Sequence, residues 1–116
     1  MAELLVDTDV FVDHLRGARE LTPGRHTLSY SVVTRCELFA DRSTDEEAVG
    51  LLLAPFRELP IDRAVAEQAG RIRRETSIRT PDALIAATAL VHRLGLMTRN
   101  ARDFEPVAGL RVTPPT

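Results

Sequence analysis

The chain has 116 residues, of which 44% are hydrophobic and 28% charged, and its formal net charge at pH 7 is −2. This length predicts one domain over residues 1–116, because chains divide into several domains only well above this size. The single cysteine, Cys36, excludes an internal disulfide and is typical of a cytoplasmic protein, and we expect it to be buried. No apolar run reaches the roughly 20 residues that cross a bilayer, and no secretion signal is visible at the N-terminus.

All 15 basic residues are arginine. The lack of lysine excludes enzymes that use lysine as a base, as a Schiff base or as the phosphate-binding residue of a P-loop. Arginine holds phosphate through two hydrogen bonds, although the base composition of the gene is the favoured explanation of an arginine-only set. The weakly negative net charge by itself argues against strong nucleic-acid binding.

Short apolar runs alternate with helical patterns along the chain. Strands are predicted over residues 3–6, 26–30, 58–61, 96–98 and 110–112. Helices are predicted over residues 8–16, 31–42, 44–56, 63–77 and 81–94. This alternation predicts an α/β fold with a mostly parallel sheet, and residues 113–116 are expected to form a loose tail.

Residues with side-chain oxygens precede these helices. We expect N-caps at Thr8, Ser31, Asp62 and Thr80. Gly17 and Gly95 are expected to end the first and last of the helices. The last helix is apolar almost all round, which predicts a place in the middle of the protein.

Glu37 stands where an acid is costly. By helical spacing it shares a face with Val33, Cys36 and Ala40, so that it lies in a stripe expected to face the core. A buried carboxylate without a partner costs several kcal/mol or takes up a proton. Glu37 therefore needs a cation, which is either an arginine or a metal ion.

Other acids lie at the ends of apolar elements. Asp7 ends the first strand and Asp103 follows the strand over 96–98, and ligands bind beyond the carboxyl ends of parallel strands. Asp82 and Asp9 lie in first turns of helices, where the helix dipole favours an acid without any functional reason. Taken singly, Asp7 and Asp9 are also explained as helix caps and Asp103 as a turn residue.

Together, Asp7, Glu37, Asp82 and Asp103 predict a metal site. Clustered carboxylates repel one another, and a hard divalent cation removes that repulsion. Ligands that are all oxygen favour Mg²⁺ or Mn²⁺ over zinc, and no histidine or cysteine has zinc-ligand spacing. Glycine-rich nucleotide loops and the Gly-x-Ser-x-Gly elbow are absent. The residues thus favour metal-assisted phosphodiester chemistry.

Three segments resemble the PIN-domain family, and in particular VapC-like toxins of VapBC toxin–antitoxin pairs. LLVDTDVFVD is similar to the first strand and helix of the family, and SVVTRCELFA to its second acidic motif. The most specific segment is TPDALIAATALVHRLGLMTRNARDFEPVAGLRV, which is similar to the C-terminal half of these toxins. The resemblance spans nearly the whole chain.

The resemblance implies a three-layer α/β/α sandwich and a Mg²⁺-dependent endoribonuclease (with Mn²⁺ as the alternative ion), silenced by a VapB-like antitoxin and expected to form a homodimer. It implies that Asp7, Glu37, Asp82 and Asp103 hold the metal, with Asp9, Thr98 and Asn100 around them. Because they flank these motifs, four arginines are candidates for RNA phosphate contacts: Arg16, Arg79, Arg99 and Arg102.

The chain departs from the family pattern in three places. Asp9 stands where relatives often carry Asn or Ser, and Ala40-Asp41 stands where many carry a glycine. The 44 residues between Glu37 and Asp82 make a compact version. We expect the first departure to add a ligand or shift the metal preference, and the last to shorten the helical arm that faces substrate.

Two other functions were considered. A haloacid-dehalogenase-type phosphotransferase also begins with a strand followed by Asp-x-Asp, as at Asp7 and Asp9, but it needs a downstream lysine that this chain lacks. The alternative that remains is a non-catalytic PIN-like module that binds RNA or a protein. Loss of one acid would favour that module, whereas all four acids are present.

Overall fold

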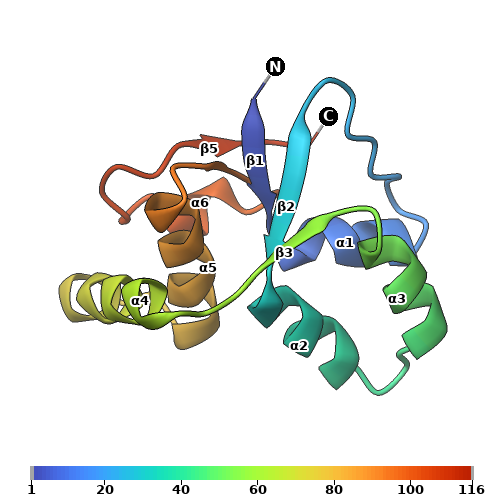
Figure 1. Ribbon diagram of the computed structural model, residues 1–116, viewed down its shortest axis with the longest axis horizontal. Coiled ribbons are helices and arrows are strands. Elements are labelled where there is room, and N and C mark those ends of the chain that lie inside the picture. Colours follow the sequence, from blue (N-terminus) through green and yellow to red (C-terminus); the bar gives the residue numbers. More distant parts are fainter. Residues whose placement is uncertain (1, 116) are drawn as a thin grey trace.

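The computed structural model describes residues 2–115. Its five-stranded sheet has the order β3-β2-β1-β4-β5, and each pairing between neighbouring strands is parallel. The strands are β1 (Glu3–Val6), β2 (Thr27–Ser31), β3 (Arg57–Leu59), β4 (Gly95–Met97) and β5 (Val112–Thr113). The predicted parallel sheet is confirmed, with β1 at its centre (Figure 1).

Helices cover both faces of the sheet. They are α1 (Thr8–Leu15), α2 (Val32–Ala40), α3 (Glu46–Leu53), α4 (Arg63–Glu75), α5 (Thr80–Val91) and α6 (Ala101–Phe104). Figure 1 shows α1, α2 and α3 on one side of the sheet and α4 and α5 on the other. The three-layer α/β/α architecture is therefore confirmed, although the single turn of α6 was not predicted.

Side chains of β1 point alternately to the two faces of the sheet, and a separate hydrophobic core lies on each face. Leu4 and Val6 point toward α1, α2 and α3, where they pack with Phe11. Leu5 points to the other face and packs with Leu59 and the residues of α4 and α5. Because successive side chains of a strand point to opposite faces, a strand buried on both sides is apolar at consecutive positions. β1 thus fixes the centre of the molecule.

α5 is the buried helix that its composition predicted, with Ile85 and five other residues buried. It ends at Val91, earlier than expected, and Gly95 is not its stop. The chain turns instead at Arg93, whose φ of 57° is in the left-handed region. Gly95 belongs to β4, where an added Cβ would lie 2.9 Å from Cδ2 of Leu4. A side chain at position 95 would therefore require the terminal methyl group of Leu4 to move.

Two of the four expected N-caps are confirmed and two are corrected. Ser31 accepts from the N–H of Val33, and Asp62 accepts from the N–H of Val65. Helix α1 is capped by Asp7 instead of Thr8, and the cap position of α5 is Arg79 instead of Thr80. In both corrected cases the cap lies one residue earlier than the pattern indicated.

The predictions for the buried face of α2 were wrong. Cys36 is exposed, as is Ala40, while Glu37 is only half-buried. The buried residues of this helix are Thr34 and Leu38. Each follows directly after a residue of the expected stripe, so the helix is rotated by about one residue from the predicted orientation. The helix packs on α1 and the sheet along that rotated face, and so leaves the cysteine in solvent.

The C-terminal segment is more ordered than expected. Thr113, placed in the loose tail by the sequence, pairs with Met97 as part of β5. Arg19 donates to the carbonyl of Pro115, while Thr116 lies outside the described residues. No helix within residues 2–115 is long and apolar enough to span a membrane.

Candidate metal centre

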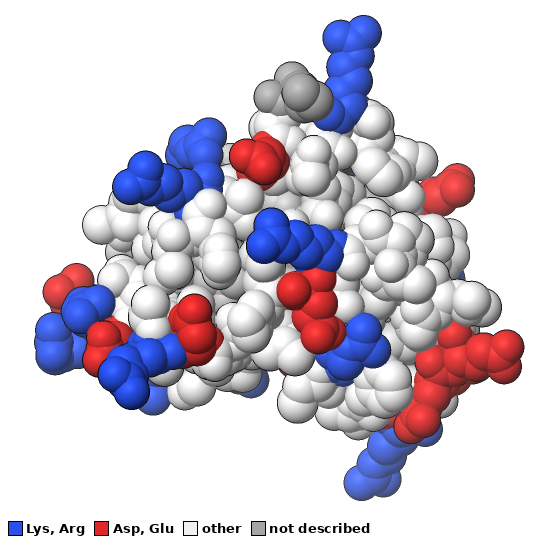
Figure 2. All heavy atoms as spheres, viewed as in Figure 1, with Lys and Arg blue, Asp and Glu red and all other residues white. Residues whose placement is uncertain are grey.

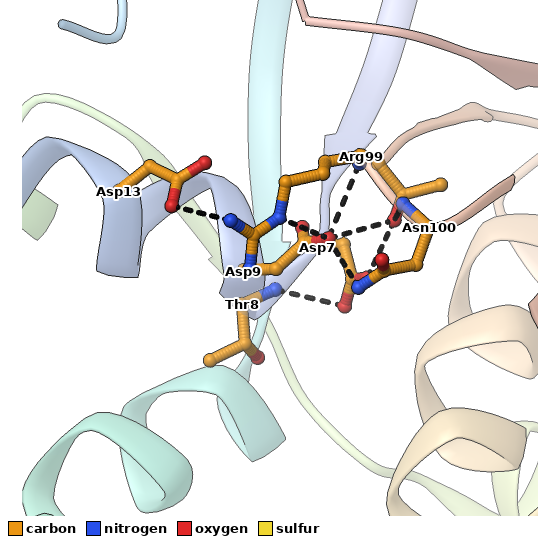
Figure 3. A network of polar contacts seen from close by, with 7 residues as sticks. Asp7, Thr8, Asp9, Asp13, Arg99 and Asn100 are labelled. Carbon is orange, nitrogen blue, oxygen red and sulfur yellow. Dashed lines mark hydrogen bonds and ion pairs between the residues drawn. The ribbon is translucent and has the colours of Figure 1, made fainter. Parts of the chain in front are cut away.

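The acidic site lies at the carboxyl ends of β1 and β4. Asp7 follows β1 directly, and Thr98 follows β4. These strands are neighbours, with Val6 paired to Met97, so parallel pairing brings two segments about 90 residues apart to the same edge. Figure 3 shows the resulting network of polar contacts between the start of α1 and the segment after β4.

Asp7 is the most enclosed acid, with 6% of its surface exposed. Its Oδ1 accepts from the N–H of Thr8 at 2.8 Å, and its Oδ2 accepts from Oγ1 of Thr98 at 2.8 Å. Burial and, next, the negative charge of Asp9 raise the pKa of Asp7 to about 7, although the hydrogen bonds from Thr98 and Thr8 act in the opposite direction. A group that titrates this high lacks a compensating positive charge.

Asp9 is held through one of its two oxygens. Its Oδ2 accepts from Oγ1 of Thr98 at 3.2 Å, from the N–H of Arg99 at 3.2 Å and from Nδ2 of Asn100 at 2.9 Å. Its Oδ1 is buried and has no hydrogen-bond partner. Burial raises the pKa of Asp9, while the contacts with Thr98 and Arg99 act in the opposite direction. Asp9 thus has one oxygen left to accept a hydrogen bond or a cation.

Glu37 joins the site through a pair of threonines. Oγ1 of Thr8 donates to Oε1 of Glu37 at 2.6 Å and lies 3.0 Å from Oγ1 of Thr34. Because a hydroxyl has one proton, Thr34 is the donor in the second contact. Glu37 is therefore connected to α1 through Thr8, the residue after Asp7, although it does not lie in the apolar stripe proposed from the sequence.

Asp82 and Asp103 lie on the other side of the centre. Half-burial raises the pKa of Asp82, as do the charges of Glu37 and Asp103, while Arg79 lowers it. Asp82, Asp103 and Arg79 line a depression of about 620 Å³ between the start of α5 and α6. Asp103 itself is exposed. Asp82 is thus the acid that links the other three electrostatically, because its charge acts on Asp7 and the charges of Glu37 and Asp103 act on it. Asp103 lies at the rim.

The four candidate arginines surround the site unevenly. Arg99 contacts Asp9 and Asp13, and Arg79 lies beside Asp82. Arg16 lines a groove next to Glu37, and Arg102 is exposed in α6. Figure 2 shows basic and acidic side chains interspersed on the visible face, without one continuous basic surface.

Sequence reasoning missed three residues of this network. Thr8 was assigned only a capping role, and Thr34 and Asp13 were not considered. Thr34 stands three residues before Glu37, so helical spacing places the two side chains on one face. Asp13 stands four residues after Asp9 on α1, a spacing that also places two side chains on one face of a helix. Helical spacing from the predicted acids is the signal that would have found both.

The donor set fits a hard cation, although it is not preassembled around one. Within residues 2–115, no three acidic, histidine or cysteine side chains lie close enough together to hold a metal ion. The groups that face the centre are carboxylates, and the buried Oδ1 of Asp9 has no hydrogen-bond partner. Carboxylate oxygens are the ligands that Mg²⁺ and Mn²⁺ prefer. The chemistry of the site therefore fits such an ion.

A model of the family described as "PIN domain" matches residues 4–110. The chain belongs to the PIN-domain family. A similar relative is Ribonuclease VapC10 of Mycobacterium tuberculosis, which is 42% identical over 87% of this chain and 85% of the relative. Ribonuclease VapC19 of the same organism is 32% identical over 86% of this chain and 90% of its own length.

Solved structures show the same architecture as this PIN domain. A toxin–antitoxin complex from Klebsiella pneumoniae contains a chain that matches with a TM-score of 0.78 and 31% identity, over 97% of this chain and 98% of that one. VapBC2 from Rickettsia felis, bound to a promoter DNA fragment, matches with a TM-score of 0.83 over 98% and 99%. At 16% identity, that second likeness shows the fold alone.

Proposed function

We propose that this PIN domain is a metal-dependent endoribonuclease and the toxin of a toxin–antitoxin pair. The observation that carries the proposal is the placement of Asp7 and Asp9 together at the carboxyl ends of β1 and β4, where both contact Thr98 and the buried Oδ1 of Asp9 has no hydrogen-bond partner. Burial and the charge of Asp9 raise the pKa of Asp7 to about 7. A site that keeps uncompensated carboxylates together at a cost in stability is typical of a functional centre. The relatives named as ribonucleases support RNA as the substrate.

Asp7, Glu37, Asp82 and Asp103 would hold Mg²⁺ or Mn²⁺. Such an ion, when bound, activates water and stabilises charge on the leaving oxygen of a phosphodiester. Thr98 holds Asp7 in place, Thr8 orients Glu37, and Asn100 orients Asp9 so that its Oδ1 stays free. We propose that Arg16, Arg79 and Arg102 contact RNA phosphates along the rim.

The proposed partner is a VapB-like antitoxin. A groove of about 320 Å³ runs between α1, α2 and α3, and Glu37 lies on its wall. Its apolar lining includes Val12, Leu15 and Leu38, of which Leu15 is 40% exposed. A chain segment seated there would reach the acidic centre and silence it. The likeness to a chain of the toxin–antitoxin complex from Klebsiella pneumoniae supports this assignment.

Cleavage of labelled total RNA by the purified, antitoxin-free protein tests the enzyme. We expect discrete products with Mg²⁺ or Mn²⁺, none with EDTA, and a loss of at least roughly 100-fold in rate for Asp82→Asn and Asp7→Asn, because a ligand of the catalytic ion is removed. Glu67→Gln is the matched control, since it removes an exposed acid of α4 and should cleave normally.

The same samples distinguish the non-catalytic alternative. Folded protein that binds RNA without cutting it, with either ion, would favour a binding module. Cleavage by folded Asp7→Asn at the wild-type rate would contradict the role of the acidic centre. Circular dichroism of each variant establishes that the fold is intact.

A further inference from the structure

The guanidinium of Arg99 lies between two aspartates of α1. Its Nη1 donates to Oδ1 of Asp13 at 2.8 Å, and its Nε lies 3.7 Å from Oδ2 of Asp9. The backbone N–H of Arg99 donates to the same Oδ2 of Asp9 at 3.2 Å. Figure 3 shows the arginine side chain reaching across from the segment after β4 to both acids. Arg99 thus contacts Asp9 with both its backbone and its side chain.

Asp13 is placed to fix this arginine. Its side chain is only 13% exposed, whereas that of Arg99 is 52% exposed. Asp9 and Asp13 are one helical turn apart, so they present two carboxylates to one planar guanidinium. A charge-assisted hydrogen bond to a largely enclosed carboxylate limits the motion of a long side chain. Asp13 has no other part in the proposed site.

We propose that Arg99 is the internal counter-cation of the acidic centre, positioned by Asp13, and that it sets the affinity of the centre for divalent metal. The inference rests on the proposed function, because it concerns the same metal site. The positive charge of Arg99 offsets Asp9 in the metal-free protein and repels an incoming cation. Metal binding therefore requires that the centre overcome, or displace, a charge that the chain itself supplies.

Binding of Mn²⁺ alone, without RNA, tests the inference by isothermal titration calorimetry at pH 8. We expect Arg99→Gln to bind Mn²⁺ roughly tenfold more tightly than the wild type, because a positive charge 3.7 Å from the carboxylate of Asp9 is removed. Arg19→Gln is the matched control: Arg19 lines the same surface depression as Arg99 and Asp13, but its side chain donates to the carbonyl of Pro115. Its Kd should stay within about twofold of the wild type, since exposed charges farther away are screened.

A double-mutant cycle tests the positioning role of Asp13. In the Asp13→Ala variant, Arg99 is no longer held over Asp9. The increase in Mn²⁺ binding free energy that Arg99→Gln causes should therefore be less than half of the increase it causes in the wild type. Two independent charges would instead give fully additive effects, and that result would overturn the role of Asp13. The Kd of Arg99→Lys for Mn²⁺ should lie between those of the wild type and Arg99→Gln, because lysine keeps the charge but lacks the planar guanidinium.

Failure of this inference can be told apart from failure of the proposed function. If the wild type binds Mn²⁺, Asp7→Asn does not, and Arg99→Gln is unchanged, then the metal site stands and the counter-cation is overturned. If neither the wild type nor Arg99→Gln binds Mn²⁺, both proposals are overturned. Binding that appears only in Arg99→Gln supports the counter-cation directly.

Discussion

Asp7 is a carboxylate at the end of an apolar strand, enclosed by protein, with hydrogen bonds from Thr8 and Thr98. Those donors stabilise its charged form, but burial and the nearby charge of Asp9 outweigh them. The folded chain therefore binds a proton at Asp7 that the unfolded chain releases. This difference links the stability of the fold to pH.

Stability of the metal-free protein should fall as pH rises from about 4 to about 7. The pKa of Asp7 rises from 3.8 to about 7 on folding, so the folded chain holds more protons in that window and loses stability as they leave. Asp7→Asn should remove the largest part of this slope, and the remainder comes from Asp9 and Asp82, whose pKa values are also raised. It should stabilise the protein at pH 8 by about 1–3 kcal/mol, since an amide carries no charge to desolvate. Urea unfolding of the wild type and Asp7→Asn in EDTA, at pH 5 and at pH 8, measures the two free energies of unfolding.

Glu67→Gln, which changes an exposed acid, should keep the wild-type slope in the same experiment. An unchanged pH dependence in Asp7→Asn would show that another group carries the slope.

Thr98 is the donor shared by Asp7 and Asp9, so Thr98→Val should be costly at pH 8. The substitution keeps the shape but leaves two enclosed carboxylates without that hydroxyl, and we expect a loss of about 2–3 kcal/mol. Thr88→Val is the control, because Thr88 is equally buried but donates to a helix carbonyl, that of Leu84. Urea unfolding of both variants provides the comparison, and equal losses would contradict the assigned role of Thr98.

Among the elements, those with a strong local signal were predictable. The apolar run of β1, the caps Ser31 and Asp62 and the uniformly apolar α5 each depend on neighbouring residues along the chain. The single turn of α6 is too short for a periodic pattern, and its leading residue Asn100 bonds to Asp9 instead of capping the helix. Tertiary contacts decide such elements.

The candidate site divides in the same way. The position of Asp7 follows from the end of β1 and was predictable, as was the place of Asp82 in the first turn of α5. The orientation of Glu37 was not, because α2 is rotated so that Thr34 and Leu38 face the core. Rotation of a helix on its neighbours depends on packing across the sheet, which the periodicity of α2 alone does not define.

The end of α5 carries a local strain that can be relieved. Arg93 has a φ of 57°, a conformation that costs an ordinary residue energy and costs glycine little. Arg93→Gly should therefore stabilise the protein by about 0.5–1 kcal/mol, measured by thermal unfolding. Arg71→Gly, at an exposed position in the interior of α4, is the opposite control and should destabilise by about 1 kcal/mol. Loss of stability in Arg93→Gly would contradict this account of the helix end.

For the whole molecule, the charge distribution limits how RNA is held. The net charge is −2, and basic and acidic side chains are mixed on the face seen in Figure 2. A protein of this kind does not bind RNA through a broad positive field. In the proposed ribonuclease, affinity for RNA would therefore come from a few local contacts and from the bound ion.

The salt dependence of RNA binding should accordingly be shallow. If Arg16, Arg79 and Arg102 each contact one phosphate, log K should fall with log[salt] with a slope of about −2, at roughly 0.7 per contact for single strands. Fluorescence anisotropy of Asp82→Asn with a single-stranded RNA measures the slope without cleavage. Removing one of these arginines should reduce the slope by about 0.7. A slope that does not change would exclude that arginine as a phosphate contact.

The sheet order places β1 beside β4, and the hydrogen bond from Thr98 to Asp7 joins residues 91 positions apart. During synthesis, a ribosome has therefore released Asp7 long before Thr98 and Asn100 have been made. The nascent chain carries Asp7 and Asp9 without the segment that orients them, because β4 can pair with β1 only after residues 95–97 have been made. The centre of the proposed nuclease is therefore completed late in synthesis relative to its first acids.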